Sequence, residues 1–565
     1  MGQITVDWGY SFGDPNHCTN GDSEFWRTVT DSANNVYVTG ILSGYMDLDP
    51  SPTDTTIIGC GSYIPVFFLA KYHADGSFAW ARQFYQTVGL SYGNDLKLDS
   101  HGDVIAVGTF YDNAIVNIRK PDTTWINCSG TSSCNPFIVK YTKDGNFEWI
   151  HTLDCGHGGS AEGLQIDPLD NLYISGSSDG GIDLDPYSGN FYISSPNNIG
   201  NTFLAKYSPD CHFIWGKNWA GGSNYSTSLC MNSKYQLGLV GAFATEVYFP
   251  LNNTTTHYYA NNPREMIMVQ YDSTGTLLWS KHFDSLGYQS QVQPLRMVND
   301  HNDSYILVGG YTGTIDLDPS PNLQFLTMTA SSGEGFFAKY DSLGNYLYAH
   351  SLHGDFASYT ESVAVNEDNE IYIYGTFSGH VDMDPGATTA TLNANGYYDY
   401  FGKYSPTGTL LWYTSIGSNG CDIESHNLYY ANSKIYISGE FNENVDFDPT
   451  SLTYILNAPP MSNTQTGNGY LVRYTELPVG IPENNTAATF TIIPNPATDR
   501  LSLTFPGTMP LGRYEVLDIL GHIVLSGNIQ DILENGINIA DLRAGSYFIR
   551  IEDSRSANAS KFIKI

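Results

Sequence analysis

A strand-like segment that ends in glycine recurs along the 565-residue chain and constrains its fold more than any other feature. The copies are NVYVTG (35–40), DVIAVG (103–108), NLYISG (171–176), QLGLVG (236–241), YILVG (305–309), EIYIYG (370–375) and KIYISG (434–439). An aromatic and basic segment follows each copy and ends in a tyrosine: Tyr72, Tyr141, Tyr207, Tyr271, Tyr340, Tyr404 and Tyr474. A repeat on this scale indicates a chain built from similar supersecondary units rather than from unrelated domains.

Each unit is predicted to contain four strands. The first approaches an Asp or Asn turn, the second is the VYVTG-like segment, and the third is the FLAKY-like segment. A glycine-containing hairpin turn then leads to a fourth strand with one large aromatic residue: Trp80, Trp149, Trp215, Trp279, Tyr348 and Trp412. Four-stranded units repeated around a centre favour an all-β fold, a β-propeller with one unit per blade. Because the aromatic series recurs with the fold, we expect it to pack between blades.

The two ends of the repeat region complement each other. After YLVRY, the seventh unit reaches ELPVGIPENN without producing a fourth, Trp-bearing strand. The missing strand resembles the N-terminal segment ITVDWGYSF (4–12), in which Trp8 matches Trp80 of FAWARQF (78–84). The sequence therefore predicts that residues 1–478 form a seven-bladed propeller whose N-terminal strand completes blade seven.

The repeated phrases VYVTG, DLDP and FLAKYxxxGxxxW resemble the SBBP-type β-propeller repeat of bacterial secreted proteins. That resemblance implies architecture and little chemistry.

A different kind of sequence follows the repeats. Residues 479–489 are rich in Pro, Asn and Thr and are predicted to be a linker. Residues 490–565 contain short strands, among them YEVLDILGHIVLSG (514–527) and KFIKI (561–565), and favour a small β-sandwich. Their ordered motifs, from Pro494-Asn495-Pro496 to the final strand, resemble the type A C-terminal sorting domain of the type IX (Por) secretion system of Bacteroidota. The resemblance implies recognition by that machinery and an extracellular or outer cell-surface location.

Composition excludes several partner classes. The chain carries 58 Asp and Glu against 25 Lys and Arg, a formal net charge of −33, which disfavours nucleic acid and anionic lipid. No apolar run is long enough to predict a membrane span. Eight cysteines suit an oxidising compartment, and Cys128 and Cys134, which bracket CSGTSSC, are predicted to form a disulfide.

A D-x-D-P motif recurs in five units, whereas units two and four lack it. Two carboxylates at i and i+2 on an extended segment can bind a hard cation such as calcium, and they can equally accept backbone N–H groups at a turn. The ten candidates are Asp47, Asp49, Asp183, Asp185, Asp316, Asp318, Asp382, Asp384, Asp446 and Asp448.

Other candidates are few. Four residues near loops are possible acid or base groups: Asp154, His157, Asp355 and Glu361. Four aromatic residues outside the repeat pattern are possible ligand contacts: Trp125, Tyr225, Tyr258 and Tyr397. No spacing among them defines a catalytic site, so the sequence favours a binding module for a carbohydrate or a surface protein. A calcium-dependent hydrolase or lyase at the loop face or channel mouth, and a structural adhesion or matrix protein, remain the alternatives.

Overall fold

The computed structural model describes residues 4–13, 23–59, 64–86, 88–118, 123–128, 134–187, 189–194, 200–221, 225–251, 254–262, 264–386, 388–450, 452–458, 467–476, 491–504, 513–517, 523–529, 536–543, 545–552 and 557–564. Within these ranges the fold is all-β, with many small sheets and no α-helix. The chain divides into two compact units, one containing Val6–Thr475 and the other Glu476–Ile565. The predicted linker, 479–489, lies outside the described residues.

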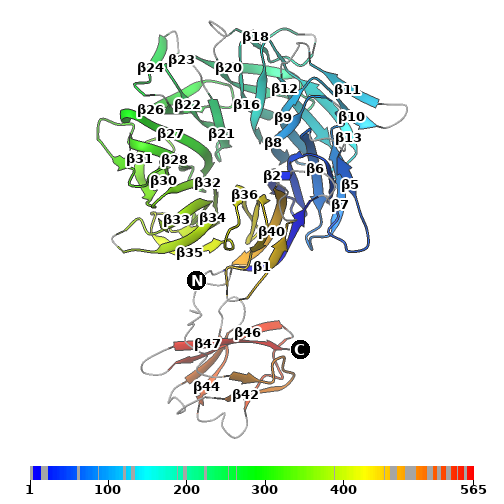
Figure 1. The fold of residues 1–565 in the computed structure, drawn as a ribbon, viewed down its shortest axis with the longest axis vertical. Helices are drawn as coiled ribbons and strands as arrows, with labels where there is room; N and C mark the ends of the chain where they lie inside the picture. The colour runs from blue at the N-terminus through cyan, green and yellow to red at the C-terminus, as the bar shows by residue number, and fades with distance from the viewer. Residues whose placement is uncertain are drawn as a thin grey trace. The chain divides into compact units, whose positions relative to one another are not determined.

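In the larger unit, antiparallel sheets of consecutive strands follow one another around a common centre (Figure 1). Each sheet is named here by its first strand. The β2, β8 and β15 sheets contain β2 (Ser23–Thr30), β3 (Val36–Leu42), β6 (Val66–Tyr72) and β7 (Phe78–Gln83); β8 (Ser91–Leu98), β9 (Val104–Tyr111), β12 (Cys134–Tyr141) and β13 (Phe147–Thr152); and β15 (Gly159–Ile166), β16 (Leu172–Ser178), β19 (Asn201–Tyr207) and β20 (Phe213–Gly221).

The same order continues through the second half of the unit. The β21, β27 and β32 sheets contain β21 (Tyr225–Met231), β22 (Leu237–Phe243), β25 (Glu265–Tyr271) and β26 (Leu277–Phe283); β27 (Ser285–Asn299), β28 (Tyr305–Asp316), β30 (Glu334–Tyr340) and β31 (Tyr346–Leu352); and β32 (Ala357–Val365), β33 (Ile371–Asp382), β34 (Thr391–Tyr404) and β35 (Leu410–Ile416).

The last sheet of this unit joins segments from the two ends of the repeat region. Its order is β36 (Ile423–Ala431), β37 (Lys434–Phe441), β40 (Asn468–Glu476) and β1 (Ile4–Phe12), so the N-terminal strand is hydrogen-bonded beside β40. Strand β1 also contacts the β2 sheet, because Trp8 Nε1 donates to Ala74 O at 3.4 Å and the Phe12 ring stacks on Phe25 at 4.9 Å.

Shorter strands form separate small sheets, except that β23 and β24 extend the β15 sheet beyond β20 and β29 pairs with β28 of the β27 sheet. They are β4 (Tyr45–Asp47) with β5 (Ile57–Gly59), β10 (Asn113–Ile118) with β11 (Thr123–Asn127), β14 (Asp154–Cys155) with β17 (Ile182–Asp183) and β18 (Tyr192–Ile193), β23 (Glu246–Leu251) with β24 (Thr254–Tyr259), β29 (Phe325–Thr327) with β28, and β38 (Asn444–Asp446) with β39 (Ile455–Asn457).

The repeated glycine of the second strand is required by a bulge in the first. In the β2 sheet, Trp26 is the extra residue of a bulge between the pairs Phe25–Gly40 and Arg27–Thr39. A Cβ on Gly40 would lie 1.9 Å from the carbonyl oxygen of Glu24, and the same distance recurs between Gly108 and Tyr92 O. No side chain fits at that separation, so this close backbone contact explains why the repeated VYVTG segment ends in glycine.

The large aromatic residues of the fourth strands pack between sheets, which confirms the expectation from their recurrence. Trp80 Nε1 donates to Lys143 O at 3.1 Å, Trp215 Nε1 to Ser273 O at 3.2 Å, and Tyr348 OH to Pro406 O at 3.2 Å. Each acceptor lies in the hairpin turn of the following sheet. These side chains therefore connect neighbouring sheets and leave little ring surface for a ligand.

The smaller unit has two sheets around one core. They are β41 (Thr491–Ile493), β42 (Arg500–Thr504) and β45 (Ile537–Asn538), and β44 (Ile523–Asn528), β43 (Arg513–Leu517), β46 (Gly545–Glu552) and β47 (Ala557–Lys564). Leu501 and Ile537 from the first sheet share a buried cluster with Val516, Ile549 and Phe562 from the second.

The predicted Cys128–Cys134 disulfide is not formed in the structure, where neither sulfur belongs to a disulfide. Cys134 begins β12 opposite Tyr111, and its sulfur lies against Gly158, where a Cβ would be 3.0 Å away. The Cys134 side chain is thus packed against the segment that leads into the β15 sheet, and the pairing with Cys128 stays a prediction.

Candidate functional site

The D-x-D-P aspartates cap turns in all five copies. The first carboxylate accepts two backbone N–H groups on Oδ1, as Asp47 does from Asp49 N at 3.1 Å and Thr56 N at 2.8 Å. The second accepts one from two residues later, as Asp49 does from Ser51 N at 2.9 Å. The equivalent bonds are present at Asp183, Asp185, Asp316, Asp318, Asp382, Asp384, Asp446 and Asp448.

The residue between the two aspartates explains why the motif follows the repeat. Its carbonyl oxygen accepts the hydroxyl of the tyrosine that ends the third strand, as Leu48 O does from Tyr72 at 3.0 Å. The other four such pairs are Tyr207–Leu184, Tyr340–Leu317, Tyr404–Met383 and Tyr474–Phe447. In the two units without the motif, the Tyr141 hydroxyl is buried without a partner and the Tyr271 hydroxyl accepts Trp219 Nε1 at 2.8 Å. The motif therefore serves the fold, and calcium binding by the remaining oxygens stays a prediction.

The four predicted acid or base groups lie in different segments: Asp154 in β14, Glu361 in β32, and His157 and Asp355 in bends between strands. Asp154 in β14 is exposed opposite Asp183 of β17, and the exposed His157 lies against Gly180. Asp355 pairs with His380, and Glu361, beside a bulge in β32, accepts Thr376 Oγ1 at 3.0 Å. The structure does not show these four side chains converging on one site.

The predicted ligand-contacting aromatics are also separate. Trp125 in β11 is 58% exposed and Tyr397 in β34 is 49% exposed, on different sheets. Tyr258 in β24 shares a hydrogen bond of 3.0 Å with Ser280 Oγ. Tyr225 begins β21, and its side chain lies outside the described part of the structure.

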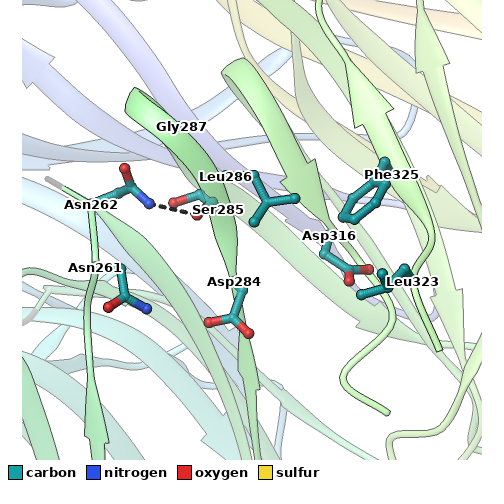
Figure 2. Close-up of a pocket in the computed structure, with 9 residues that line it drawn as sticks. All are labelled: Asn261, Asn262, Asp284, Ser285, Leu286, Gly287, Asp316, Leu323 and Phe325. Atoms are coloured by element: carbon teal, nitrogen blue, oxygen red, sulfur yellow. Dashed lines mark hydrogen bonds between the residues drawn. The ribbon is translucent and has the colours of Figure 1, made fainter. Parts of the chain in front are cut away.

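A pocket of about 530 Å³ lies where the β21 sheet meets the β27 sheet, and no sequence motif predicted it (Figure 2). Its lining combines amides, carboxylates and apolar side chains: Asn261, Asn262, Asp284, Ser285, Leu286, Gly287, Asp316, Leu323 and Phe325. Leu323 is 64% exposed and Phe325 is 44% exposed. An exposed aromatic ring beside several hydrogen-bonding groups can contact both the apolar and the hydroxyl-bearing parts of a polyhydroxylated ligand.

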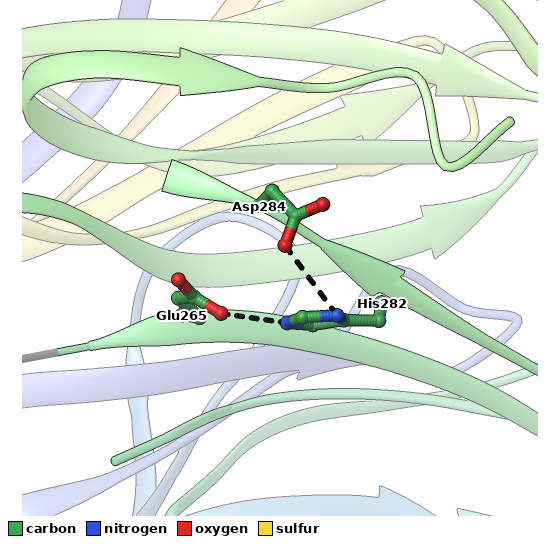
Figure 3. A group of neighbouring side chains, drawn as sticks. All are labelled: Glu265, His282 and Asp284. Atoms are coloured by element: carbon green, nitrogen blue, oxygen red, sulfur yellow. Dashed lines mark hydrogen bonds and ion pairs between the residues drawn. The ribbon is translucent and has the colours of Figure 1, made fainter. Parts of the chain in front are cut away.

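A histidine lies between two carboxylates, one of which, Asp284, also lines the pocket (Figure 3). His282 Nε2 lies 2.7 Å from Oε2 of the fully buried Glu265, and His282 Nδ1 lies 3.7 Å from Oδ1 of the exposed Asp284. Oε1 of Glu265 accepts Asn261 N at 3.1 Å, so the same buried carboxylate also holds the loop that lines the pocket.

One signal in the sequence could have identified this site. Glu265 begins the third strand of its unit, EMIMVQY, where the equivalent positions in other units carry Val66, Asn201 and Asn468. A charged residue entering an otherwise buried strand must find a polar partner. Here the partner is His282, which lies three residues after the repeated Trp279 in β26 (Leu277–Phe283).

A second buried glutamate, Glu334, occupies the equivalent position in the β27 sheet. It accepts Thr329 N at 2.7 Å, Ser351 Oγ at 2.8 Å and His353 Nδ1 at 3.1 Å. Burial acts to raise the pKa of Glu334, but the hydrogen bonds from His353 and its other donors outweigh burial and hold that pKa far below its ordinary value. The same hydrogen bond raises the pKa of His353, against the opposing effect of burial.

This pair predicts a pH-dependent contribution to stability. A raised histidine pKa stabilises the fold fully below its unfolded value of about 6.5, and that contribution is lost as pH rises through the folded-state pKa. The lowered pKa of Glu334 changes the stability only at acidic pH, so it does not affect stability between pH 5.5 and 8.5. We expect the melting temperature of the unmodified protein to fall as the pH rises above 6.5, and that of His353→Gln to fall less. The corresponding loss of unfolding free energy is under about 1 kcal/mol, because the His353 side chain is half exposed. Melts from pH 5.5 to 8.5 test this, and identical slopes for both proteins would contradict it.

Comparison with known proteins adds one assignment. Residues 491–565 match the family described as a secretion system C-terminal sorting domain. This match implies recognition by the type IX secretion machinery and indicates export to the extracellular space or the cell surface. No helix in the described residues has the length and apolar character needed to cross a membrane.

The repeat region has more distant relatives. The chain is 24% identical over 529 residues to an uncharacterised WD repeat-containing protein of Acanthamoeba polyphaga mimivirus, an alignment that covers 80% of this chain and 37% of that protein. The chain therefore spans little more than a third of the length of this curated relative.

Two solved structures show low similarity. They are virginiamycin B lyase from Staphylococcus aureus (9% identity, 83% of this chain and 98% of that chain, TM-score 0.37) and a protein of unknown function from Bacteroides caccae (10% identity, 62% and 89%, TM-score 0.31). At these TM-scores neither likeness assigns a fold or an activity to this chain.

Proposed function

We propose that this protein is an extracellular or cell-surface binding module, in which a closed seven-bladed β-propeller of residues 1–478 presents a carbohydrate site. The linker 479–489 then joins the propeller to the sorting domain, 490–565. The observation that carries the binding proposal is the pocket beside Phe325, where an exposed ring and several polar groups line about 530 Å³.

Closure is supported by a contact that β1 shares with ordinary fourth strands. Trp8 Nε1 donates to Ala74 O, in the hairpin turn of the β2 sheet. Trp80 Nε1 makes the same bond to Lys143 O, one sheet further on. Strand β1 is also the neighbour of β40. Both observations support the proposal that β1 is the fourth strand of the last blade.

The lining of the pocket favours a saccharide over an apolar ligand. Sugar hydroxyls need paired donors and acceptors, which Asn261, Asn262 and Asp284 supply, while the C–H face of a pyranose can pack on Phe325. Strand register fixes this ring beside the polar groups, because Phe325 in β29 is the partner of Asp316 in β28. A surface protein is the alternative ligand that the same test addresses.

A polysaccharide and glycan binding screen of the full chain, with calcium and again with EDTA, tests the proposal. We expect Phe325→Ala to lower affinity for the bound glycan about tenfold or more, because a buried phenylalanine contributes on the order of 1.5–3 kcal/mol. The matched control is Phe356→Ala, which removes another exposed phenylalanine, 57% exposed, that does not line the pocket. Absence of any glycan binding would shift the interpretation to a protein partner or a structural role.

A further inference from the structure

The hydrogen bonds around His282 leave one ring nitrogen facing a second acceptor. Nε2 lies 2.7 Å from Glu265 Oε2, and since a carboxylate only accepts, that nitrogen carries its proton. In the neutral ring Nδ1 then presents a lone pair, 3.7 Å from Asp284 Oδ1. That separation is longer than an ordinary hydrogen bond. Two acceptors thus face each other across a gap.

The imidazole is held in this orientation by its surroundings. Its ring packs between Phe243 and Tyr258, each with a centroid distance of 5.3 Å. Glu265 is fixed in turn by Asn261 N and by the Ser285 hydroxyl at 3.4 Å. A carboxylate that orients the far side of a histidine is the usual outer partner of a metal-binding imidazole, because it fixes the tautomer and raises the basicity of the ligating nitrogen.

From this geometry we infer that His282 Nδ1 and the Asp284 carboxylate bind a divalent transition-metal ion, with Glu265 as the orienting group; of these three residues, Asp284 also lines the pocket. An ion with bonds of about 2.0–2.2 Å to nitrogen and oxygen can span the gap in a bent arrangement. The imidazole ligand favours zinc over calcium and manganese, both of which prefer oxygen ligands. This inference concerns the ion alone and does not depend on the saccharide proposal.

The neighbouring sheet supplies an internal comparison. Glu334 and His353 repeat the buried glutamate and histidine pair, but there the histidine itself occupies the strand position that Asp284 holds. Within the described residues, Glu265, His282 and Asp284 are the group of three ligating side chains whose donor atoms all lie within 4.8 Å of one another. The Glu334 pair is therefore a matched control that keeps the histidine and lacks the second ligand.

Titration calorimetry on the untagged, EDTA-treated full chain tests the inference with zinc chloride, manganese chloride and calcium chloride. We expect one zinc ion per chain, and at least a tenfold loss of affinity in both His282→Gln and Asp284→Asn. His353→Gln should leave zinc affinity unchanged. Asp284 is exposed, so Asp284→Asn tests the ion site even if His282→Gln folds poorly.

Several results would overturn the inference. Zinc that does not bind saturably, or that binds equally well to the unmodified chain and to both site variants, would show that His282 and Asp284 do not form an ion site. Calcium binding that survives both substitutions would point to the D-x-D-P aspartates. Cobalt absorbance gives a second readout, because an imidazole ligand alters the visible spectrum of the bound ion and His282→Gln should remove that band. Glycan binding is measured separately, so failure of one proposal leaves the other open to test.

Discussion

Deletion of residues 1–12 is expected to lower the melting temperature of the larger unit by about 6–10 °C. The deletion removes β1, whose Trp8 and Phe12 side chains are 7% and 1% exposed. Loss of a buried aromatic side chain costs about 3–5 kcal/mol, so two together remove on the order of 6–10 kcal/mol. The backbone edge of β40 would also become an unpaired edge, and we expect faster aggregation on heating. Differential scanning calorimetry measures the first effect and light scattering the second.

The control for this deletion is removal of residues 490–565. The smaller unit has its own buried core, so its loss should leave the main melting transition nearly unchanged. A second control, Trp8→Phe in the full chain, should lower the transition far less than the deletion because most apolar contact remains. If the protein without residues 1–12 melted like the intact chain, the proposed closure of the propeller by β1 would be wrong.

Asp47→Ala is expected to destabilise the larger unit by about 2–4 kcal/mol, because two backbone N–H groups lose a charged acceptor at once. Those donors are Asp49 N and Thr56 N, both bonded to Asp47 Oδ1. Asp47→Asn keeps an oxygen at that position and should retain most of the stability. Chemical unfolding of the three proteins measures the difference, and Asp54→Ala, at an exposed position of the same loop, is the control.

This substitution pair also separates a turn cap from a calcium ligand. A turn cap needs an oxygen and no charge, so Asp47→Asn should resemble the unmodified protein with or without calcium. A calcium site needs the negative charge, so Asp47→Asn would then behave like Asp47→Ala and calcium would stabilise only the unmodified chain. The second pattern would restore the metal interpretation of the D-x-D-P motif.

The repeat made the all-β organisation predictable because each of its residues has a local physical role. The glycine of VYVTG accommodates a neighbouring carbonyl, and Trp80, Trp215 and Tyr348 of the fourth strands donate to the next hairpin turn. The partner of the tyrosine that ends FLAKY was not predictable, because its hydroxyl reaches a carbonyl 24 residues away in Tyr72–Leu48. Such contacts depend on the path of the short hairpin between the second and third strands, here β4 with β5. The spacing of the motifs along the chain does not determine that path.

Most of the candidate site was not predicted, for a related reason. Its residues come from the loop after β24, the segment that leads into β27 and the start of that strand, the end of β28 and the region of β29, and of them only Asp316 belongs to a predicted motif. The one histidine among the predicted acid and base groups is His157, beside a glycine turn, whereas His282 lies within β26, a strand that matches the repeat. Departures from the repeat, such as Glu265, are the more informative signal.

The position of β1 has a consequence for the order of events during synthesis. Phe12 ends β1 and Asn468 begins its partner β40, so 456 residues must be added before the two can pair (468 − 12 = 456). At translation rates of about 5–20 residues per second, the first strand waits roughly half a minute to a minute and a half for its neighbour. During that time its backbone lacks the partner strand β40, although Trp8 and Phe12 can already contact the β2 sheet. Strand β1 is thus made long before its sheet can form, and a factor that shields nascent apolar strands would act on residues 4–12.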